Sequence, residues 1–247
     1  MTIERLKQSK TLHLDRIETH HNGGFAFIFK ADYKGCSVAV KCSKLSKNCL
    51  QNKYANPSHF SYELEFLSNL RKKNHPNIIQ LIQDDRQLQC LVLEYISFGS
   101  LRTYLFKRRS DTSRPTFDEL LLIAVKIAGA LELLEEEGII HLAMQARNVL
   151  VNRNGDVKLT GFQFCRTLSQ IKEKGIRNVV FERHFKWMDR NALGFVSVVP
   201  RTVSWSFGVF LYEILTLGCE PYSHSKKHLD SDELERKALT SSQAKIF

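Results

Sequence analysis

The stretch His141-Leu-Ala-Met-Gln-Ala-Arg-Asn148 brings an imidazole, a guanidinium and a carboxamide close together in the chain. The carboxamide of Asn148 offers a metal ion one neutral oxygen, whereas Mg²⁺ prefers carboxylates together with water and phosphate oxygens. Near the middle of the stretch lies Ala143, whose methyl group can neither accept a proton nor orient a hydroxyl group. The stretch therefore provides a weak candidate metal ligand, and at Ala143 no group that accepts a proton.

Five other segments stand in an order that matters as much as their residue types. They are Ser37-Val-Ala-Val-Lys41, Glu94-Tyr-Ile96 with Phe98-Gly-Ser-Leu101, Gly161-Phe-Gln163, Lys186-Trp-Met-Asp-Arg-Asn-Ala-Leu193 and the run from Trp205 to Gly218. Together with His141–Asn148 they resemble the motifs of the protein kinase superfamily, and in particular those of tyrosine-kinase-like, receptor-type catalytic domains. The resemblance covers residues 12–222, and it is specific because all these motifs occur in the family's order.

Hydrophobic patterns along the chain predict short strands first and helices later. Residues 11–43 alternate apolar and polar side chains between glycine-containing turns, which is typical of an antiparallel sheet. Apolar residues recur at helical spacing in 61–70 and in 117–134, so we expect both segments to be helices. Asn154-Gly155, between two short apolar runs, predicts a hairpin.

The resemblance implies an α+β fold with two lobes and a nucleotide cleft between them. A small antiparallel β lobe with one helix would span about residues 12–94, and a mainly α-helical lobe about residues 97–222. Residues 1–11 would form an N-terminal extension, and residues 223–247 a polar tail or an incomplete αG region. The helices that normally end the helical lobe would be missing, so we expect apolar surface to lie uncovered on its long helices.

The same resemblance implies a partly preserved nucleotide site. Lys41 would pair with the phosphates and with a glutamate of the helix 61–70, for which Glu63 fits best and Glu65 is the alternative. Of the glycines that would cover the phosphates Gly23 remains, and a plain hairpin turn explains it as well. Core packing would equally explain the apolar residues of the site. The other residues that the resemblance assigns to nucleotide binding are Ile28, Ala39, Leu93, Glu94, Ile96, Asn148 and Leu150.

Two positions that carry the chemistry in this family hold residues without a functional side chain. Ala143 replaces the general base, and Gly161 replaces the aspartate that bridges Mg²⁺ to the phosphates. A missing base alone costs about 10²- to 10⁴-fold in rate. We therefore expect a catalytically impaired pseudokinase that acts as a signalling scaffold or allosteric partner of another protein. We also expect weak, metal-independent ATP binding and no bound Mg²⁺.

Two alternatives stay open on the residues alone. An active protein (tyrosine) kinase that transfers phosphate from ATP would need a catalytic group that the motifs do not provide. A truncated, non-functional kinase fragment would follow from the absence of the terminal helices. The stability and the phosphotransfer activity of the purified chain separate these possibilities.

Composition indicates a globular chain in the cytoplasm. The 247 residues are 43% apolar, with no run long enough to cross a membrane and no signal-peptide pattern at the N-terminus. Six cysteines are scattered without a Cys-x-x-Cys pair, which is typical of reduced thiols rather than of a disulfide framework. The net charge of +10 is dispersed over short basic runs without an aromatic-interleaved stripe, which argues against a nucleic-acid partner.

Overall fold

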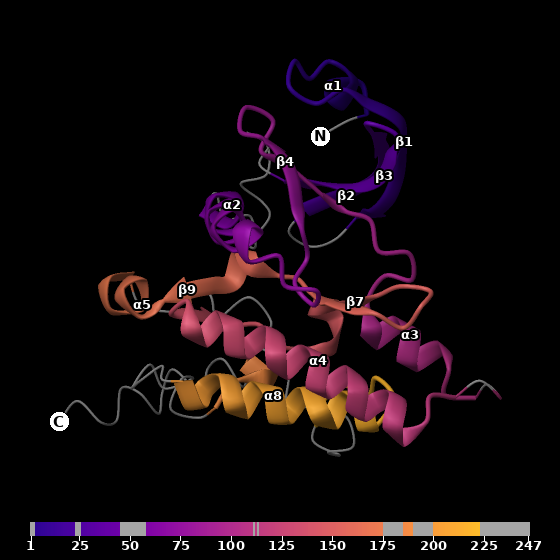
Figure 1. The fold of residues 1–247 in the computed structure, drawn as a ribbon, viewed down its shortest axis with the longest axis vertical. Coiled ribbons are helices and arrows are strands. Elements are labelled where there is room, and N and C mark those ends of the chain that lie inside the picture. Colours follow the sequence, from indigo (N-terminus) through magenta and orange to yellow (C-terminus); the bar gives the residue numbers. More distant parts are fainter. Residues whose placement is uncertain are drawn as a thin grey trace. The chain divides into compact units, whose positions relative to one another are not determined.

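A computed structural model of the chain describes residues 3–22, 26–44, 58–110, 112, 114–174, 185–189 and 200–222 (Figure 1). The chain divides into two compact units. We call them the sheet unit, which comprises Met1–Ser97 and Thr160–Gln163, and the helical unit, which comprises Phe98–Leu159 and Phe164–Phe247. One unit is built on an antiparallel sheet and the other mainly on helices, which confirms the predicted α+β fold. The predicted tail at 223–247 lies outside the described residues.

A five-stranded antiparallel sheet forms the sheet unit, in the order β1-β2-β3-β5-β4. The strands are β1 (Leu14–Asn22), β2 (Ala26–Tyr33), β3 (Cys36–Ser43), β4 (Leu81–Asp85) and β5 (Cys90–Glu94). Lys34 and Gly35 both have positive φ angles, as a tight turn between β2 and β3 requires. Buried and half-buried residues alternate along β3, so one of its faces packs in the core and the other carries Lys41.

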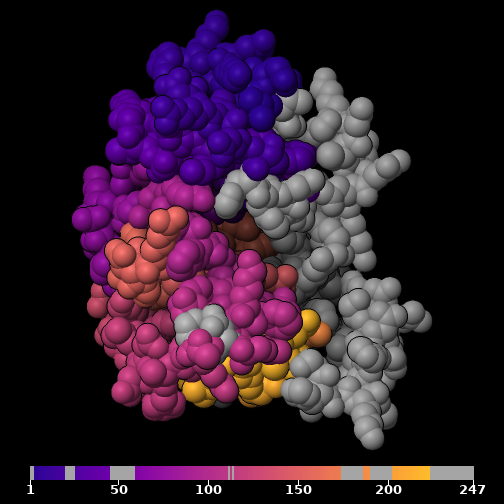
Figure 2. Space-filling model, turned by 90° about the vertical axis from the view of Figure 1, so that its right-hand side faces the viewer, coloured from indigo at the N-terminus to yellow at the C-terminus, as the bar shows by residue number. Residues whose placement is uncertain are grey.

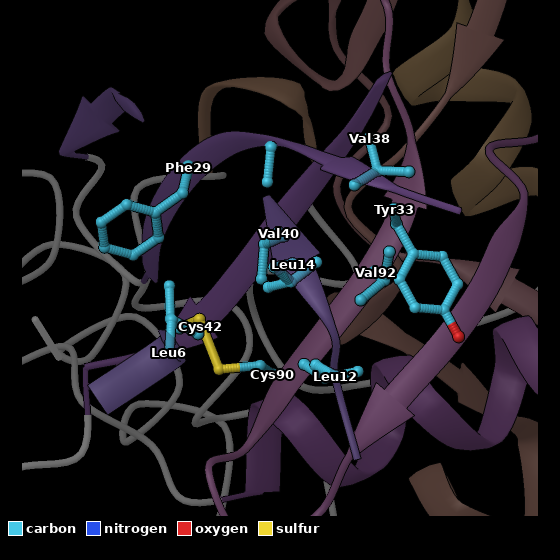
Figure 3. Packing of buried hydrophobic residues seen from close by; sticks show 11 residues of the cluster. Leu6, Leu12, Leu14, Phe29, Tyr33, Val38, Val40, Cys42, Cys90 and Val92 are labelled. Carbon is cyan, nitrogen blue, oxygen red and sulfur yellow. A yellow bond between two sulfur atoms is a disulfide. The ribbon is translucent and has the colours of Figure 1, made fainter. Parts of the chain in front are cut away.

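The core face of this sheet carries an apolar cluster that includes Phe29, Val40 and Val92 (Figure 3). Within it, Cys42 and Cys90 form a disulfide. The expectation of reduced cysteines is therefore wrong for this pair. The antiparallel register of β3 and β5 places the two cysteines opposite each other, with their Cα atoms 4.1 Å apart. Cysteine spacing in the sequence carries no information about such a register.

Two α-helices belong to the described part of the sheet unit, α1 (Ile3–Lys7) and α2 (Ser58–Leu70). Helix α2 agrees with the predicted helix, and its Glu63 and Leu67 are buried. Helix α1 is an addition, which lies within the predicted N-terminal extension and buries Leu6 completely in the apolar cluster. It is only five residues long, which is too short for a hydrophobic period to show in the sequence.

Helices α4 and α8 lie side by side in the helical unit (Figure 1). The helices of this unit are α3 (Leu101–Lys107), α4 (Phe117–Glu136), α5 (Leu168–Lys174) and α8 (Pro200–Leu215). Its short strands are β6 (Ile139–His141), β7 (Val149–Val151), β8 (Val157–Leu159) and β9 (Cys165–Thr167). The chain also forms short 3₁₀ turns. They are η2 (Arg71–Lys73) in the sheet unit, η3 (Ala146–Asn148) and η5 (Phe185–Trp187) in the helical unit, and η4 (Phe162–Phe164), whose first two residues belong to the sheet unit and whose last belongs to the helical unit. Strands β7 and β8 form the predicted hairpin, while β6 pairs with β9.

Helix α4 begins at a capping box. The Thr116 side chain accepts a hydrogen bond from the Glu119 N–H at 3.2 Å, and the Glu119 carboxylate accepts one from the Thr116 N–H at 2.7 Å. This reciprocal pair fixes the first turn of the helix whose buried side includes Ile127. None of the described helices, α4 included, is both long and apolar enough to cross a membrane.

The end of α8 is fixed against α3 in the helical unit. Figure 2 shows residues of α3 (magenta) beside the end of α8 (yellow). Arg109, which follows α3, donates from Nε to the carbonyl oxygen of Leu217 at 2.9 Å. Gly218 has a positive φ of 83° and lies so close to α3 that a Cβ atom there would be 2.7 Å from the carbonyl oxygen of Arg102. Both the positive φ angle and the nearby carbonyl oxygen of Arg102 therefore require a glycine at position 218.

Candidate functional site

Lys41 is the centre of a polar site in the sheet unit. Its Nζ lies 2.7 Å from Oε1 and 2.6 Å from Oε2 of Glu63, whose side chain is 3% exposed. The same Nζ donates to Oε1 of Gln163 at 2.9 Å. Strand β3 presents the lysine and helix α2 the glutamate, so the structure pairs Lys41 with Glu63 and not with Glu65. The role of this ion pair in nucleotide binding stays a prediction.

Strand pairing places three of the predicted nucleotide-binding residues of the sheet unit, Ile28, Ala39 and Leu93, on the same face as Lys41. Ile28 lies opposite Lys41 in the pairing of β2 with β3, and Ala39 lies opposite Leu93 in the pairing of β3 with β5. Directly opposed residues of an antiparallel pair share a face, and so do alternate residues of one strand. Ile28 and Ala39 are half-buried and Leu93 is buried. The structure thus brings these four residues together.

The other residues predicted to bind nucleotide lie at different places in the fold. Glu94 ends β5, and both its N–H and its carboxylate make hydrogen bonds with the chain that precedes β4. Ile96 follows the strand and is buried. Asn148 and Leu150 are half-buried residues of the helical unit, and Gly23 lies outside the described residues.

The loop after β6 carries Ala143 and is apolar where catalysis would need a carboxylate. Leu142, Ala143 and Met144 are all buried. Asn148 turns its amide nitrogen Nδ2 to the carbonyl oxygen of Ala143, at 2.7 Å. The amide nitrogen of Asn148 thus closes the loop on itself, and Oδ1 is the atom that would hold a metal ion in the resembling family.

Glu213 of α8 holds this loop in place. Its Oε2 accepts hydrogen bonds from the Ala146 N–H at 2.7 Å and from the Trp187 Nε1–H at 2.9 Å. Burial raises the pKa of the carboxyl group above its ordinary value, although these two hydrogen bonds act in the opposite direction. The Arg147 guanidinium lies over the Trp187 ring, 5.3 Å from its centre. Glu213 therefore connects α8 with the loop after β6 and with η5.

Gly161 is the second position that resemblance assigns to metal binding. It lies in the sheet unit just before η4 and has a φ of 92°, a conformation that favours glycine. Glycine has no side-chain ligand, and the described residues contain no group of three or more His, Cys, Asp or Glu side chains that could hold a metal ion. The residues present therefore do not fit a Mg²⁺ ion bound in the manner of the family. That the chain binds no Mg²⁺ stays a prediction.

The sequence patterns assign no role to two polar residues, Gln163, which contacts Lys41, and Glu213, which contacts the loop after β6. Gln163 takes the last position of the triplet Gly161-Phe-Gln163, where the family has glycine, and an amide in place of glycine is a visible signal. Glu213 lies in an otherwise apolar run of α8, and carboxylates are rarely buried unless they are paired or hydrogen-bonded. Both residues stand out by type, although their partners cannot be deduced from the sequence.

A separate hollow of about 600 Å³ lies within the helical unit, between α4, β6 and α8. Its lining is mostly apolar and includes Val125, Leu168, Val203 and Phe207. None of the predicted site residues that the structure describes lines it. The hollow opens to solvent, since the side chains of Val125 and Leu168 are exposed.

Comparison with known proteins agrees with the resemblance to the protein kinase superfamily. The family described as protein tyrosine and serine/threonine kinase matches residues 14–245. The chain is also 28% identical over 198 residues to the serine/threonine/tyrosine-protein kinase HT1 of Arabidopsis thaliana, which covers 79% of this chain and 48% of that protein. The chain thus spans about half the length of this curated relative. Because the family match extends over the sheet unit and the helical unit, the chain belongs to the protein tyrosine and serine/threonine kinase family.

Proposed function

We propose that this chain is a catalytically impaired, tyrosine-kinase-like pseudokinase that acts as a signalling scaffold or allosteric partner of another protein. The observation that carries the proposal is the presence of Ala143 and Gly161 at the positions of the general base and the metal-binding aspartate. A missing base costs about 10²- to 10⁴-fold, and the lost metal carboxylate removes charge stabilisation as well. From kinase rates of about 1–100 s⁻¹, these losses together leave turnover at or below detection.

The residues that flank Ala143 in the described loop supply no carboxylate that could replace the base. Leu142 and Met144 are buried and apolar. Glu213 contacts the loop, but its Oε2 accepts two hydrogen bonds within a fully buried setting, which is a structural role. The surroundings therefore support impairment rather than a relocated catalytic group.

Apolar surface on the helical unit supports the proposed binding of a protein partner. On α4 the side chains of Leu121, Leu122 and Val125 are 50%, 53% and 60% exposed. The same helix borders the mostly apolar hollow of about 600 Å³. Contiguous exposed apolar surface commonly marks a site of protein interaction. This surface fits a protein whose work is binding rather than phosphate transfer.

We also propose that ATP binds weakly and without Mg²⁺. Lys41 and Glu63 form the ion pair that the family places next to the phosphates, whereas Gly161 offers no metal ligand. Thermal unfolding of the purified chain with ATP, in Mg²⁺ or in EDTA, tests this. Stabilisation that persists in EDTA and disappears in Lys41→Met would support the proposal, and stabilisation that requires Mg²⁺ would contradict it.

An active kinase is the specific alternative, because the matched relative HT1 is named as a serine/threonine/tyrosine kinase. Incubation with labelled ATP and Mg²⁺ separates the two readings: we expect no phosphate incorporation above that of Lys41→Met. Incorporation that Lys41→Met abolishes would refute the proposed function. The other alternative, a non-functional fragment, predicts that the purified chain lacks a cooperative unfolding transition, which circular dichroism would detect.

A further inference from the structure

The ammonium group of Lys41 is saturated by acceptors from its own chain. A lysine ammonium has three N–H donors. Among the described residues, its Nζ has three acceptor oxygens in reach: Oε1 and Oε2 of Glu63 at 2.7 and 2.6 Å, and Oε1 of Gln163 at 2.9 Å. All three residues belong to the sheet unit, because Gln163 ends the segment Thr160–Gln163. An incoming phosphate would have to replace one of these oxygens.

The cavity beside the ammonium group is small. The cavity next to Lys41, to which Ser43, Glu63 and Gln163 contribute, has a volume of about 20 Å³. A cavity of about this size holds a single water molecule, whereas a phosphate group is larger. Glu63 and Gln163 are buried, while the side chain of Lys41 is 16% exposed. A phosphate therefore fits into this cavity only if a side chain moves away.

Gln163 is the acceptor that a phosphate can replace. Separating Glu63 from Lys41 would leave a buried carboxylate without its countercharge, which is strongly destabilising. Releasing the neutral amide of Gln163 leaves no charge uncompensated. A phosphate oxygen is also a stronger acceptor for an ammonium donor than an amide oxygen is. Gln163 therefore controls whether Lys41 can bind an external anion.

The position of this amide is set by its neighbours in the chain. Phe162, the preceding residue, is fully buried, and Gly161 turns the backbone with its φ of 92°. Gln163 itself lies in the 3₁₀ turn η4 and is 6% exposed. Its side chain is thus ordered next to Lys41 before any ligand arrives, so the contact requires little further ordering.

We propose that Gln163 is a built-in ligand of Lys41, which occupies the place of a nucleotide phosphate and weakens anion binding at this lysine. This inference rests on the proposed function, since it concerns how the same Lys41 site is regulated. Gln163 is the residue that determines specificity at this site. With Gln163 in place Lys41 makes an internal contact, and with Gln163 displaced it becomes a site for a polyphosphate anion.

Calorimetric titration with ATP, and separately with inorganic tripolyphosphate, tests the proposal in EDTA. Gln163→Gly and Gln163→Ala should bind both anions at least about tenfold more tightly than the wild type does. Gln163→Glu is the matched control, because it keeps an acceptor oxygen next to Lys41 and adds negative charge, and it should gain nothing. The double variant Lys41→Met/Gln163→Gly should lose the gain.

Each other outcome overturns the inference. If the wild type bound the anions as tightly as Gln163→Gly does, the Gln163 amide would not compete with them for Lys41. A gain that survives Lys41→Met would place the anion elsewhere. Cooperatively folded Gly and Ala variants that gain no affinity, or loss of folding in both, would give Gln163 a purely structural role. Phosphate transfer by the wild type is a different readout, and it would refute the proposed function whatever the Gln163 variants do.

Discussion

Glu213→Ala and Glu213→Gln should differ in stability, because only the glutamine keeps the hydrogen bonds of this side chain. Both bonds end on one oxygen, Oε2, which lies 2.7 Å from the Ala146 nitrogen and 2.9 Å from Trp187 Nε1. A glutamine carbonyl oxygen can accept two hydrogen bonds, so it can replace Oε2 for both donors. An alanine leaves both buried donors without an acceptor.

The magnitude follows from the cost of each donor that loses its partner. One unsatisfied buried donor costs about 1–3 kcal/mol, so two cost about 2–6 kcal/mol. Removing a buried carboxylate offsets part of this, and we expect Glu213→Ala to lose about 2–4 kcal/mol of unfolding free energy. Glu213→Gln should lose less than Glu213→Ala, because it keeps an acceptor for both donors, although its amide nitrogen takes the buried place of Oε1, for which the described residues provide no hydrogen-bond partner.

Urea unfolding followed by tryptophan fluorescence measures this difference. The chain has two tryptophans, of which Trp187 is buried and Trp205 is 50% exposed. In a Trp205→Phe background the signal comes from Trp187, the residue that donates to Glu213. The probe therefore reports on the contact that is being altered.

The pH dependence of the unfolding free energy reports whether folding raises or lowers the pKa of Glu213. Burial raises the pKa of Glu213 in the folded protein above its unfolded value. The protonated side chain therefore contributes stability below the unfolded pKa, and this contribution is lost as the pH rises through the folded pKa. The stability of the wild type relative to Glu213→Gln should fall across that window. Equal destabilisation by alanine and glutamine, or a relative stability that rises with pH, would refute the reasoning.

Three further experiments test the structure. Gly218→Ala should lower the free energy of unfolding in urea by at least about 1 kcal/mol more than Gly35→Ala does. Both glycines have a positive φ, but of the two only Gly218 has a backbone oxygen 2.7 Å from the new Cβ. Equal losses would contradict the close approach of Gly218 to α3. Thr116→Ala removes the capping box of α4 and should lower the free energy of unfolding by about 1 kcal/mol. An unchanged urea midpoint would show that the capping box does not stabilise α4. In the unreduced, urea-unfolded chain, alkylation and peptide mapping should leave Cys42 and Cys90 unlabelled. Labelling of both would rule out the disulfide.

The sheet and the long helices could be predicted because their signals are local. Alternation along β3 and helical spacing along α4 each follow from residues a few positions apart. The disulfide between Cys42 and Cys90 could not be predicted in this way, because it depends on the register of two strands that are separated by a helix and another strand. Helix α1 could not be predicted either, because its five residues are too few to show a hydrophobic period.

The candidate site was predictable where it follows motif spacing and not where it depends on side-chain contacts. The pairing of Lys41 with Glu63 follows from the position of each residue in its motif. The contact of Lys41 with Gln163 joins residues 122 positions apart and depends on the conformation of one amide side chain. Glu213 likewise acts on a loop 67 positions away. Residue type marks both as unusual, and only the fold supplies their partners.

Phosphate transfer by the purified chain tests most directly whether Ala143 and Gly161 abolish catalysis. The chain is held in excess over labelled ATP with Mg²⁺, so that even one slow turnover is visible, and Lys41→Met, prepared in parallel, sets the background. We predict equal incorporation of label by the wild type and by Lys41→Met. Incorporation by the wild type that grows with time and is absent from Lys41→Met would contradict the pseudokinase assignment.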